Sequence, residues 1–310
     1  MNSRSHPLNR TFILLVLLLW ASFAGADTFR VATYNVENYL DETTRARQAK
    51  SPEAKAKVRE SICALKPDVI ALEEMGSLSA FQELRDSLKA AGLDFPYGEY
   101  VTGADTNIHV VVLSRFPFAA RHPHTNDNFL LSGRRFSVGR GFAEVDVQAG
   151  ANYSFTLFAA HLKSKRPVAT ADESELRFEE AKLLREKIDA RLAADPDANI
   201  IVVGDFNDTR DSASTKAVIG RGKKKLVDTR PAERNGDNAP GTDRAHEPRD
   251  ITWTEYYGKT DSYSRIDYLL ISPGMARKWV TNETYVLAIP NWGVGSDHRP
   301  IVATFEAEDK

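Results

Sequence analysis

The chain has 310 residues, of which 41 are Lys or Arg and 43 are Asp or Glu, and its formal net charge is −2. This balance excludes a strong overall attraction to polyanions, so any affinity for nucleic acid must come from local basic patches. The single cysteine, Cys63, excludes an internal disulfide and is expected to behave as a small buried apolar residue.

The first residues have the pattern of a secretory signal peptide. Two arginines precede an unbroken apolar run at 12–20, and small residues at 24–26 form a cleavage site. We therefore expect residues 1–26 to be removed and residues 27–310 to form one secreted or periplasmic domain that acts as a monomer. An uncleaved membrane anchor is the alternative. No later segment is apolar enough to be expected to span a membrane.

The predicted elements alternate between strands and helices along the chain. Alternating or β-branched apolar runs predict strands at 28–34, 68–72, 109–113, 142–147, 153–161, 199–203, 265–271 and 300–305. Apolar residues at helical spacing predict helices at 54–65, 81–88 and 173–192. Both halves of the chain therefore indicate an α/β fold, a four-layer sandwich of two mixed sheets packed face to face with helices outside. The polar segment 207–250 is expected to form a long surface excursion.

Polar residues of a few chemical types stand at the ends of these predicted strands. They are Asn35, Glu73, Glu74, His161, Asp205, Asn207, Asp267, Asp297 and His298. In α/β sheets, ligands bind beyond the strand ends, where the loops converge. Carboxylate and amide oxygens suit Mg²⁺, with Mn²⁺ or Ca²⁺ as alternatives, and imidazoles beside carboxylates suit acid–base work. Together these types indicate hydrolysis of a phosphate ester by water.

Each of these motifs also has a structural explanation when it is taken alone. Gly204–Asn207 could be a turn, because Gly, Asp and Asn are turn residues. Glu73–Glu74 could be solvated, His161 could be a structural histidine, and Asp297–His298 could be a surface pair. Their joint occurrence at successive strand ends favours one shared site.

Six polar stretches follow one another in a fixed order within residues 28–306. They are Thr33–Asn38, Leu72–Glu74, Ala160–Ser164, Gly204–Asn207, Ser264–Tyr268 and Ser296–Pro300. Taken together, they resemble the endonuclease/exonuclease/phosphatase superfamily, which has the fold of pancreatic deoxyribonuclease. The resemblance implies a metal-dependent phosphoesterase, and the form of Asn35–Asn38 is similar to that of secreted bacterial members.

The resemblance implies a metal site and a nucleophile site. Glu74 would be the principal metal ligand, with Asn35 and Asp297 near the same ion. Asp205 would position or deprotonate the attacking water, and Asn207 would hold a phosphate oxygen or the nucleophile.

The resemblance also implies groups that stabilise charge on the phosphate. His298, oriented by Asp267, would stabilise or protonate the charged phosphoryl oxygen. His161 would contact the phosphate from the opposite wall. Arg140 is similar to a substrate-binding arginine that faces the phosphate in some members, and the arginines at 134–135 are close rivals.

The sequence departs from the family pattern in three ways. Glu73 stands where the family usually has Gln, so it either adds a charge beside the metal or faces away from it. A tyrosine that many abasic-site nucleases carry has no match here. The Trp-rich and Asp-Arg signatures of inositol-polyphosphate phosphatases are absent.

The resemblance leaves the phosphate ester substrate open. A nuclease acting on DNA or RNA is favoured by the basic cluster Arg221–Lys225 and by Trp253 and Tyr256–Tyr257, which could stack on bases. A solvated loop and ordinary aromatic packing are the rival explanations of these features. The alternatives are a phosphatase or lipid phosphodiesterase on the same scaffold, and a non-catalytic binding protein. His122 and His124 could chelate a metal, but the nearby sequence offers no third ligand.

Overall fold

The computed structural model describes residues 28–45, 47–233 and 252–307. The predicted signal peptide at 1–26 and residues 234–250 of the predicted excursion lie outside the described residues. Among the helices of the described ranges, none combines the length and the apolar character that crossing a membrane requires.

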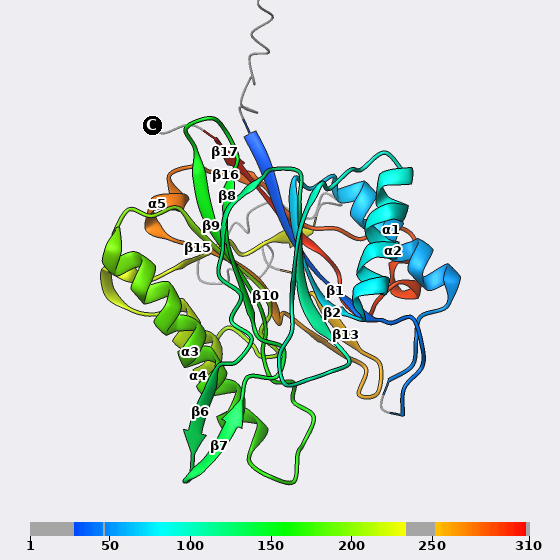
Figure 1. Ribbon diagram of the computed structural model, residues 1–310, viewed down its shortest axis with the longest axis horizontal. Coiled ribbons are helices and arrows are strands. Elements are labelled where there is room, and N and C mark those ends of the chain that lie inside the picture. The colour runs from blue at the N-terminus through cyan, green and yellow to red at the C-terminus, as the bar shows by residue number, and fades with distance from the viewer. Residues whose placement is uncertain (1–27, 46, 234–251, 308–310) are drawn as a thin grey trace, which may run out of the picture.

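Two mixed β-sheets form the centre of the molecule (Figure 1). In hydrogen-bonding order, the seven-stranded sheet consists of β12 (Ala232–Glu233), β16 (Trp279–Val286), β17 (Ile301–Glu306), β1 (Thr28–Tyr39), β2 (Val69–Met75), β4 (His109–Ser114) and β3 (Tyr97–Val101). The six-stranded sheet consists of β11 (Val227–Asp228), β15 (Asp267–Ile271), β10 (Ile200–Asp205), β9 (Ser154–His161), β8 (Phe142–Gln148) and β5 (Phe118–Arg121). Two further hairpins are β6 (Asn128–Leu131) with β7 (Arg134–Ser137), and β13 (Glu255–Tyr257) with β14 (Ser262–Ser264).

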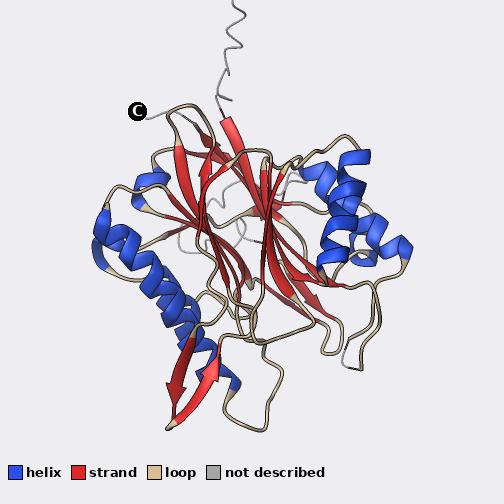
Figure 2. Cartoon of the chain, viewed as in Figure 1, coloured by secondary structure: helices blue, strands red, loops and turns tan. Residues whose placement is uncertain are grey.

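Helices cover the outer faces of both sheets, as Figure 2 shows. The pair α1 (Pro52–Leu65) and α2 (Leu78–Ala90) packs on the seven-stranded sheet. The pair α3 (Glu173–Ala194) and α4 (Ala213–Ile219) packs on the six-stranded sheet. The short helices are α5 (Pro273–Ala276), η1 (Gly222–Lys224) and η3 (Trp292–Val294). The predicted four-layer α/β sandwich is therefore confirmed.

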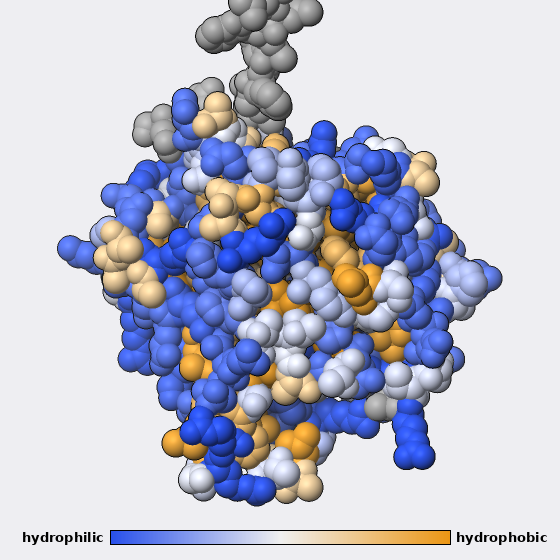
Figure 3. Space-filling model, viewed as in Figure 1, coloured by the Kyte–Doolittle hydropathy of each residue, from blue (hydrophilic) through white to orange (hydrophobic). Residues whose placement is uncertain are grey.

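An apolar core fills the space between the two sheets. Phe29 of β1 stacks on Phe155 of β9 with ring centroids 4.9 Å apart, and Phe305 of β17 packs beside them. Successive side chains of a strand point to opposite faces, so each central strand supplies both this core and the layer beneath its helices. Figure 3 shows a largely hydrophilic surface on one face, with hydrophobic residues in small patches.

Capping residues explain why α1 and α2 begin earlier than the apolar spacing predicts. Ser51 accepts a hydrogen bond from Ala54 N at 3.2 Å, and Ser77 accepts one from Ala80 N at 3.2 Å. These side chains satisfy backbone N–H groups that the first turn of a helix leaves free. Cys63 on α1 is half-buried rather than fully buried.

The predicted surface excursion at 207–250 is wrong for its described part, residues 207–233. Helix α4 packs on α3, and its Val218 and Ile219 are buried. Strands β11 and β12 extend one edge of each main sheet. The polar composition of the segment concealed these elements, because each of them buries only a few apolar side chains.

Candidate active site

Strand register brings several predicted residues together. Strand β10 pairs with β9 in parallel, which places Asp205 opposite His161, and with β15 in antiparallel, which places Asp205 opposite Asp267. In the facing sheet, the parallel pair β1 and β2 places Asn35 opposite Glu73. The predicted residues therefore gather where the central strands of the two sheets end.

The Asp205 carboxylate links polar residues of the two sheets at this end of the molecule. Its Oδ2 accepts hydrogen bonds from Asn35 Nδ2 at 3.0 Å and from Asn207 Nδ2 at 3.2 Å. His161 Nε2 lies 3.5 Å from the same oxygen, and His298 Nε2 lies 3.9 Å from it. One carboxylate oxygen thus faces two amides and two imidazoles.

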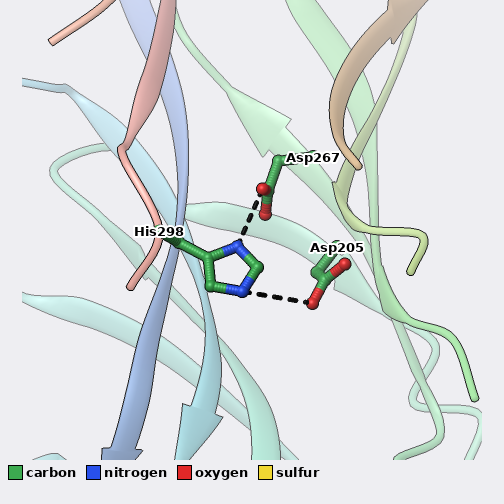
Figure 4. Close-up of side chains that lie close together, drawn as sticks. All are labelled: Asp205, Asp267 and His298. Carbon is green, nitrogen blue, oxygen red and sulfur yellow. Dashed lines mark hydrogen bonds and ion pairs between the residues drawn. The ribbon is translucent and has the colours of Figure 1, made fainter. Parts of the chain in front are cut away.

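His298 is fixed on both sides of its ring, as Figure 4 shows. Its Nδ1 lies 2.8 Å from Asp267 Oδ2, and its Nε2 points toward Asp205. Thr254 supports this pair, because its Oγ1 accepts the backbone N–H of Asp267 at 3.1 Å. Burial alone would lower the pKa of His298, but the carboxylates of Asp267 and Asp205 raise this pKa well above its usual value. His298 is therefore an imidazolium near neutral pH.

The pKa of the second imidazole of the site, that of His161, shifts in the opposite direction to the pKa of His298. Burial lowers the pKa of His161 well below its usual value, and the nearby Arg140 guanidinium adds to this effect. Burial, followed by the charge of Asp267, raises the pKa of Asp205. A neutral and a charged imidazole thus face one aspartate. We call the group His161, Asp205, Asp267 and His298 the floor.

Three carboxylates, those of Glu37, Glu74 and Asp297, form an acidic group beside the floor, which we call the rim. Burial, together with the charges of Glu37 and Glu74, raises the pKa of Asp297 to about 6. Arg47 Nη1 lies 3.4 Å from Glu74 Oε2, and Lys50 Nζ lies 3.3 Å from Glu37 Oε2. Within the described ranges, Asp297 Oδ1 is buried and has no hydrogen-bond partner.

Backbone strain is concentrated at this site. Positive φ angles occur at Glu37 (43°), Asn38 (54°), Glu74 (61°) and Asn207 (55°). Residues with side chains seldom adopt this left-handed region, and such strain collects where function requires it. Local hydrogen bonds hold these turns, since Asn38 N donates to Glu74 Oε2 at 3.0 Å and Asn207 N donates to Asp205 Oδ1 at 2.8 Å.

Two sets of side chains can be considered for a divalent cation. One is Asp205, Asp267 and His298, and the other is the predicted set Asn35, Glu74 and Asp297. The ligand atoms of the former lie within 4.8 Å of one another, so this buried group fits a divalent metal site. The latter set includes Asp297 Oδ1, which has no hydrogen-bond partner in the described chain and lies 3.8 Å from His298 Nε2. Burial, followed by the neighbouring carboxylates, raises the pKa of Asp297.

Arg140 lies on the His161 side of the site. It is 6% exposed, its Nη1 donates to Leu162 O at 3.3 Å, and its Nε has no hydrogen-bond partner in the described chain. The rival arginines at 134–135 are exposed on β7. The structure therefore places Arg140, and not its rivals, beside the floor.

Glu73 is not the solvated residue that the sequence allowed. It is fully buried, and Thr33 Oγ1 donates to its Oε1 at 2.9 Å. Burial, followed by the charge of Asp267, raises its pKa well above the usual value. Glu73 therefore lies against the floor, where burial favours its protonated form.

Two residues that the sequence did not single out also shape the site. Arg47 reaches Glu74 from the loop before α1, and no motif marks it. Ser296 Oγ donates to Asn35 O at 2.7 Å and accepts the His298 backbone N–H at 3.0 Å. Ser296 belongs to the last of the six matching stretches, and its place in that stretch is the feature of the sequence that could have identified it.

The remaining candidates from the sequence lie elsewhere. His124 pairs with a glutamate of β8, and neither His122 nor His124 enters a three-ligand group among the described residues. Arg221–Lys225 follows α4 and contributes cations to a groove beside α3. Trp253 packs against Arg299, whose guanidinium carbon lies 3.3 Å from the ring centroid, so packing explains this residue.

Solved structures of known proteins share this fold. The catalytic domain of human nocturnin gives a TM-score of 0.61 at 15% identity, covering 91% of this chain and 95% of that one. Sphingomyelinase C from Streptomyces griseocarneus gives 0.59 at 20% identity, covering 90% and 99%. TDP2 of D. rerio, in complex with a single-strand DNA product, gives 0.58 at 16% identity, covering 90% and 99%. No curated protein matches the sequence significantly.

The distant likenesses to solved structures show the fold alone, whereas a family model shows the family to which the chain belongs. The model of the Endonuclease/Exonuclease/phosphatase family matches residues 32–298, which span five of the six polar stretches in full and enter the sixth as far as His298. The chain therefore belongs to the endonuclease/exonuclease/phosphatase family and is a metal-dependent phosphoric ester hydrolase of that family.

Proposed function

We propose that this phosphoesterase is a nuclease that hydrolyses phosphodiester bonds by in-line attack of water. The observation that carries the proposal is the environment of Asp205 Oδ2. A neutral His161 approaches this oxygen from β9, and a charged His298 approaches it from the segment before β17. Attack at phosphorus requires a positioned water and fixed groups that stabilise the developing charge. The floor supplies both kinds of group within one buried cluster.

Each floor residue, and Asn207 beside the floor, has a distinct proposed role. Asp205 aligns the attacking water and accepts its proton, because its raised pKa suits a base that acts near neutral pH. Asn207 donates its amide N–H to a phosphate oxygen. His298, oriented by Asp267, stabilises or protonates the charged phosphoryl oxygen. His161 contacts the phosphate from the opposite wall.

Mg²⁺ is the cation we propose for this site, with Mn²⁺ or Ca²⁺ as alternatives. Glu74 and Asp297 would hold it, with Asn35 beside them, because Asp297 Oδ1 is buried, accepts no hydrogen bond within the described chain and lies 3.8 Å from His298 Nε2. A bound divalent cation supplies positive charge that offsets the charge of the phosphate. The buried group Asp205, Asp267 and His298 is the alternative place for the cation.

Nucleic acid is the substrate we propose, and a lipid phosphodiester is the second candidate. The TDP2 structure that contains a DNA product supports the former by analogy of fold. The similarity to sphingomyelinase C supports the latter in the same way. Two exposed aromatic residues, Tyr257 and Tyr263, also favour a lipid. They lie on the hairpin β13–β14, which is placed beside the site because it pairs with the backbone of His298.

A substrate panel tests the proposal. Plasmid DNA, RNA, phospholipid vesicles and a sugar phosphate are incubated with Mg²⁺, Mn²⁺, Ca²⁺ or EDTA. We expect cleavage of DNA or RNA that EDTA abolishes and that Asp205→Asn removes, whereas Asp211→Asn, at a side chain that is 85% exposed, keeps it. Turnover of lipid alone would refute the nuclease proposal, and chelator-resistant cleavage would refute the metal dependence.

We also propose that the protein is exported, on the basis of the N-terminal pattern at 1–26. Expression of the full chain in a bacterium, followed by N-terminal sequencing, tests this. The expected product begins at Asp27 and is found in the periplasm or the medium. A full-length chain in the membrane fraction would show that the segment is an uncleaved anchor.

A further inference from the structure

An exposed, positively charged projection stands next to the His161 side of the site. It consists of the hairpin β6–β7 (residues 128–137) and the loop at 163–171, and we call it the arm. Figure 1 shows the hairpin extending beyond the end of the sandwich. The exposed cations of the arm are Arg134, Arg135, Lys165 and Arg166.

The arginines of the arm keep their charge unneutralised. Arg134 donates to a backbone carbonyl and Arg135 to an asparagine side chain, and neither they nor Arg166 has a carboxylate partner among the described residues. Many other exposed cations are paired, such as Lys182 with Glu179 at 2.7 Å. The arm is therefore a local positive region on a chain whose net charge is −2.

The roots of the arm are fixed to the active site. The hairpin leads through Gly139 into Arg140, and the loop begins two residues after His161. The buried carboxylate of Glu180 on α3 accepts the backbone N–H of Gly139 at 3.1 Å and that of Lys163 at 2.6 Å. One side chain thus clamps both roots, and the arm has a defined position relative to the floor.

The two segments of the arm also contact each other. Arg134 Nη1 donates to Thr170 O at 3.3 Å, which joins the hairpin to the loop. The aromatic residues of the hairpin, Phe129 and Phe136, stack on one another with centroids 5.9 Å apart, and Phe129 is 8% exposed. The arm therefore displays mainly cations, with Leu130 and Val168 as its exposed large apolar side chains.

We propose that the arm binds phosphates of a nucleic-acid strand on one side of the scissile phosphodiester. This inference rests on the proposed nuclease function. The planar guanidinium is the side chain best suited to hold phosphate oxygens in pairs, and several unneutralised arginines side by side match a chain of regularly spaced phosphates. A membrane would require more apolar surface than two aliphatic side chains provide. The arm thus makes polymer length a determinant of catalytic efficiency.

The test compares a polymer with a small diester. The variant R134A/R135A/R166A is assayed on a 20-nucleotide single strand and on bis(p-nitrophenyl) phosphate over a range of salt concentrations. We expect kcat/KM for the oligonucleotide to fall and its salt dependence to weaken by about 0.7 in log–log slope for each phosphate that the arm no longer binds. The small diester cannot reach the arm, so its hydrolysis should not change. The matched control is K223A/K224A/K225A, which removes the same charge beside α4.

Each other outcome has a defined meaning. Equal kcat/KM of the arm variant and the wild type on the oligonucleotide would overturn the inference, as would an equal loss in the control variant. Loss of binding to anionic phospholipid vesicles with unchanged oligonucleotide kinetics would assign the arm to a membrane and also overturn it. A wild-type protein that hydrolyses the small diester but cuts no nucleic acid would refute the nuclease proposal itself, and the inference would fall with it.

Discussion

The floor and the rim are adjacent, but they are built differently. The floor residues lie on or beside strands, none is more than 5% exposed, and they contact one another through hydrogen bonds and close charge pairs. Of the rim residues, Glu37 and Glu74 lie near the ends of β1 and β2 at positive φ, and Asp297 lies in the loop before β17. The side chains of Glu37 and Asp297 are 41% and 40% exposed. The floor is thus arranged before any ligand arrives, whereas the rim keeps carboxylate charge that the protein neutralises only in part.

This difference indicates a division of work. Preorganised groups suit charge stabilisation and proton transfer, because they need no rearrangement during the reaction. Clustered carboxylates suit a cation, because binding relieves their mutual repulsion, and at the rim burial and the neighbouring carboxylates raise the pKa of Asp297. Variants of the floor should therefore change the rate, and variants of the rim should change the affinity for the cation.

The largest expected effect is on the floor. His298→Ala should lower kcat by about 10²–10⁴-fold, because it removes the proposed proton donor. Its affinity for Mg²⁺ should stay close to that of the wild type. Phosphodiester hydrolysis at saturating Mg²⁺ measures the former, and calorimetric titration measures the latter. His122→Ala, at a half-exposed histidine outside the site, is the control. A normal kcat in His298→Ala would break the assignment of the floor.

The next effect is on the rim. Glu74→Gln should weaken Mg²⁺ binding by at least about 10–100-fold, since removing a ligand costs no less than removing a group that orients one. Part of the activity should return at high Mg²⁺ concentration. The dependence of the initial rate on Mg²⁺ concentration shows both. Glu60→Gln, an exposed glutamate on α1, should behave as the wild type. An unchanged Mg²⁺ requirement in Glu74→Gln would place the cation elsewhere.

Ser296 links the two regions, and its removal should have an intermediate effect. Ser296→Ala leaves Asn35 O without its donor and the backbone N–H of His298 without its acceptor. The free energy of unfolding should fall by about 1–3 kcal/mol, because both groups are buried. Urea unfolding followed by circular dichroism measures this decrease. A stability equal to that of the wild type would show that water or a relaxed backbone replaces both hydrogen bonds.

The smallest expected effect is on the stability of the metal-free protein, which Asp297→Asn should increase at pH 7 but not at pH 4. Folding raises the pKa of Asp297 from 3.8 to about 6. The protonated form therefore favours the fold, and stability is lost as the pH rises through this window. Asp297→Asn should raise Tm in EDTA at pH 7 and leave it nearly unchanged at pH 4. Asp267→Asn should lower Tm at pH 7, because it removes the partner of the charged His298. Thermal scans at both pH values separate the two regions, and a lower Tm for Asp297→Asn at pH 7 would contradict the account.

Much of the floor could be predicted from the sequence, because its residues end apolar runs that form central strands. The buried run before Asp205 marks β10, and the order of the polar stretches matches one family. The edge strands β3 and β5 and the strand β16 could not be predicted, since strands with many polar or half-exposed positions carry no clear apolar pattern. Helix α4 is concealed for a similar reason, since it is only seven residues long and two of its four buried residues are polar.

Contacts made by loop residues also could not be predicted from the sequence. Arg47 meets Glu74 through the path of the loop at 41–51, and no periodicity encodes that path. The choice of Arg140 over the arginines at 134–135 depends on where the β6–β7 hairpin ends. Neighbouring residues of the same type become distinguishable only when the pairing of such a hairpin is known.

The most direct measurement is the position of the cation. A crystal of the protein is soaked in Mn²⁺, and an anomalous difference map locates the ion. The account predicts a peak held by the carboxylates of Glu74 and Asp297, with the His298–Asp267 hydrogen bond intact. A peak coordinated by Asp205, Asp267 and His298, with nothing at the rim, would contradict the division of work between the two regions.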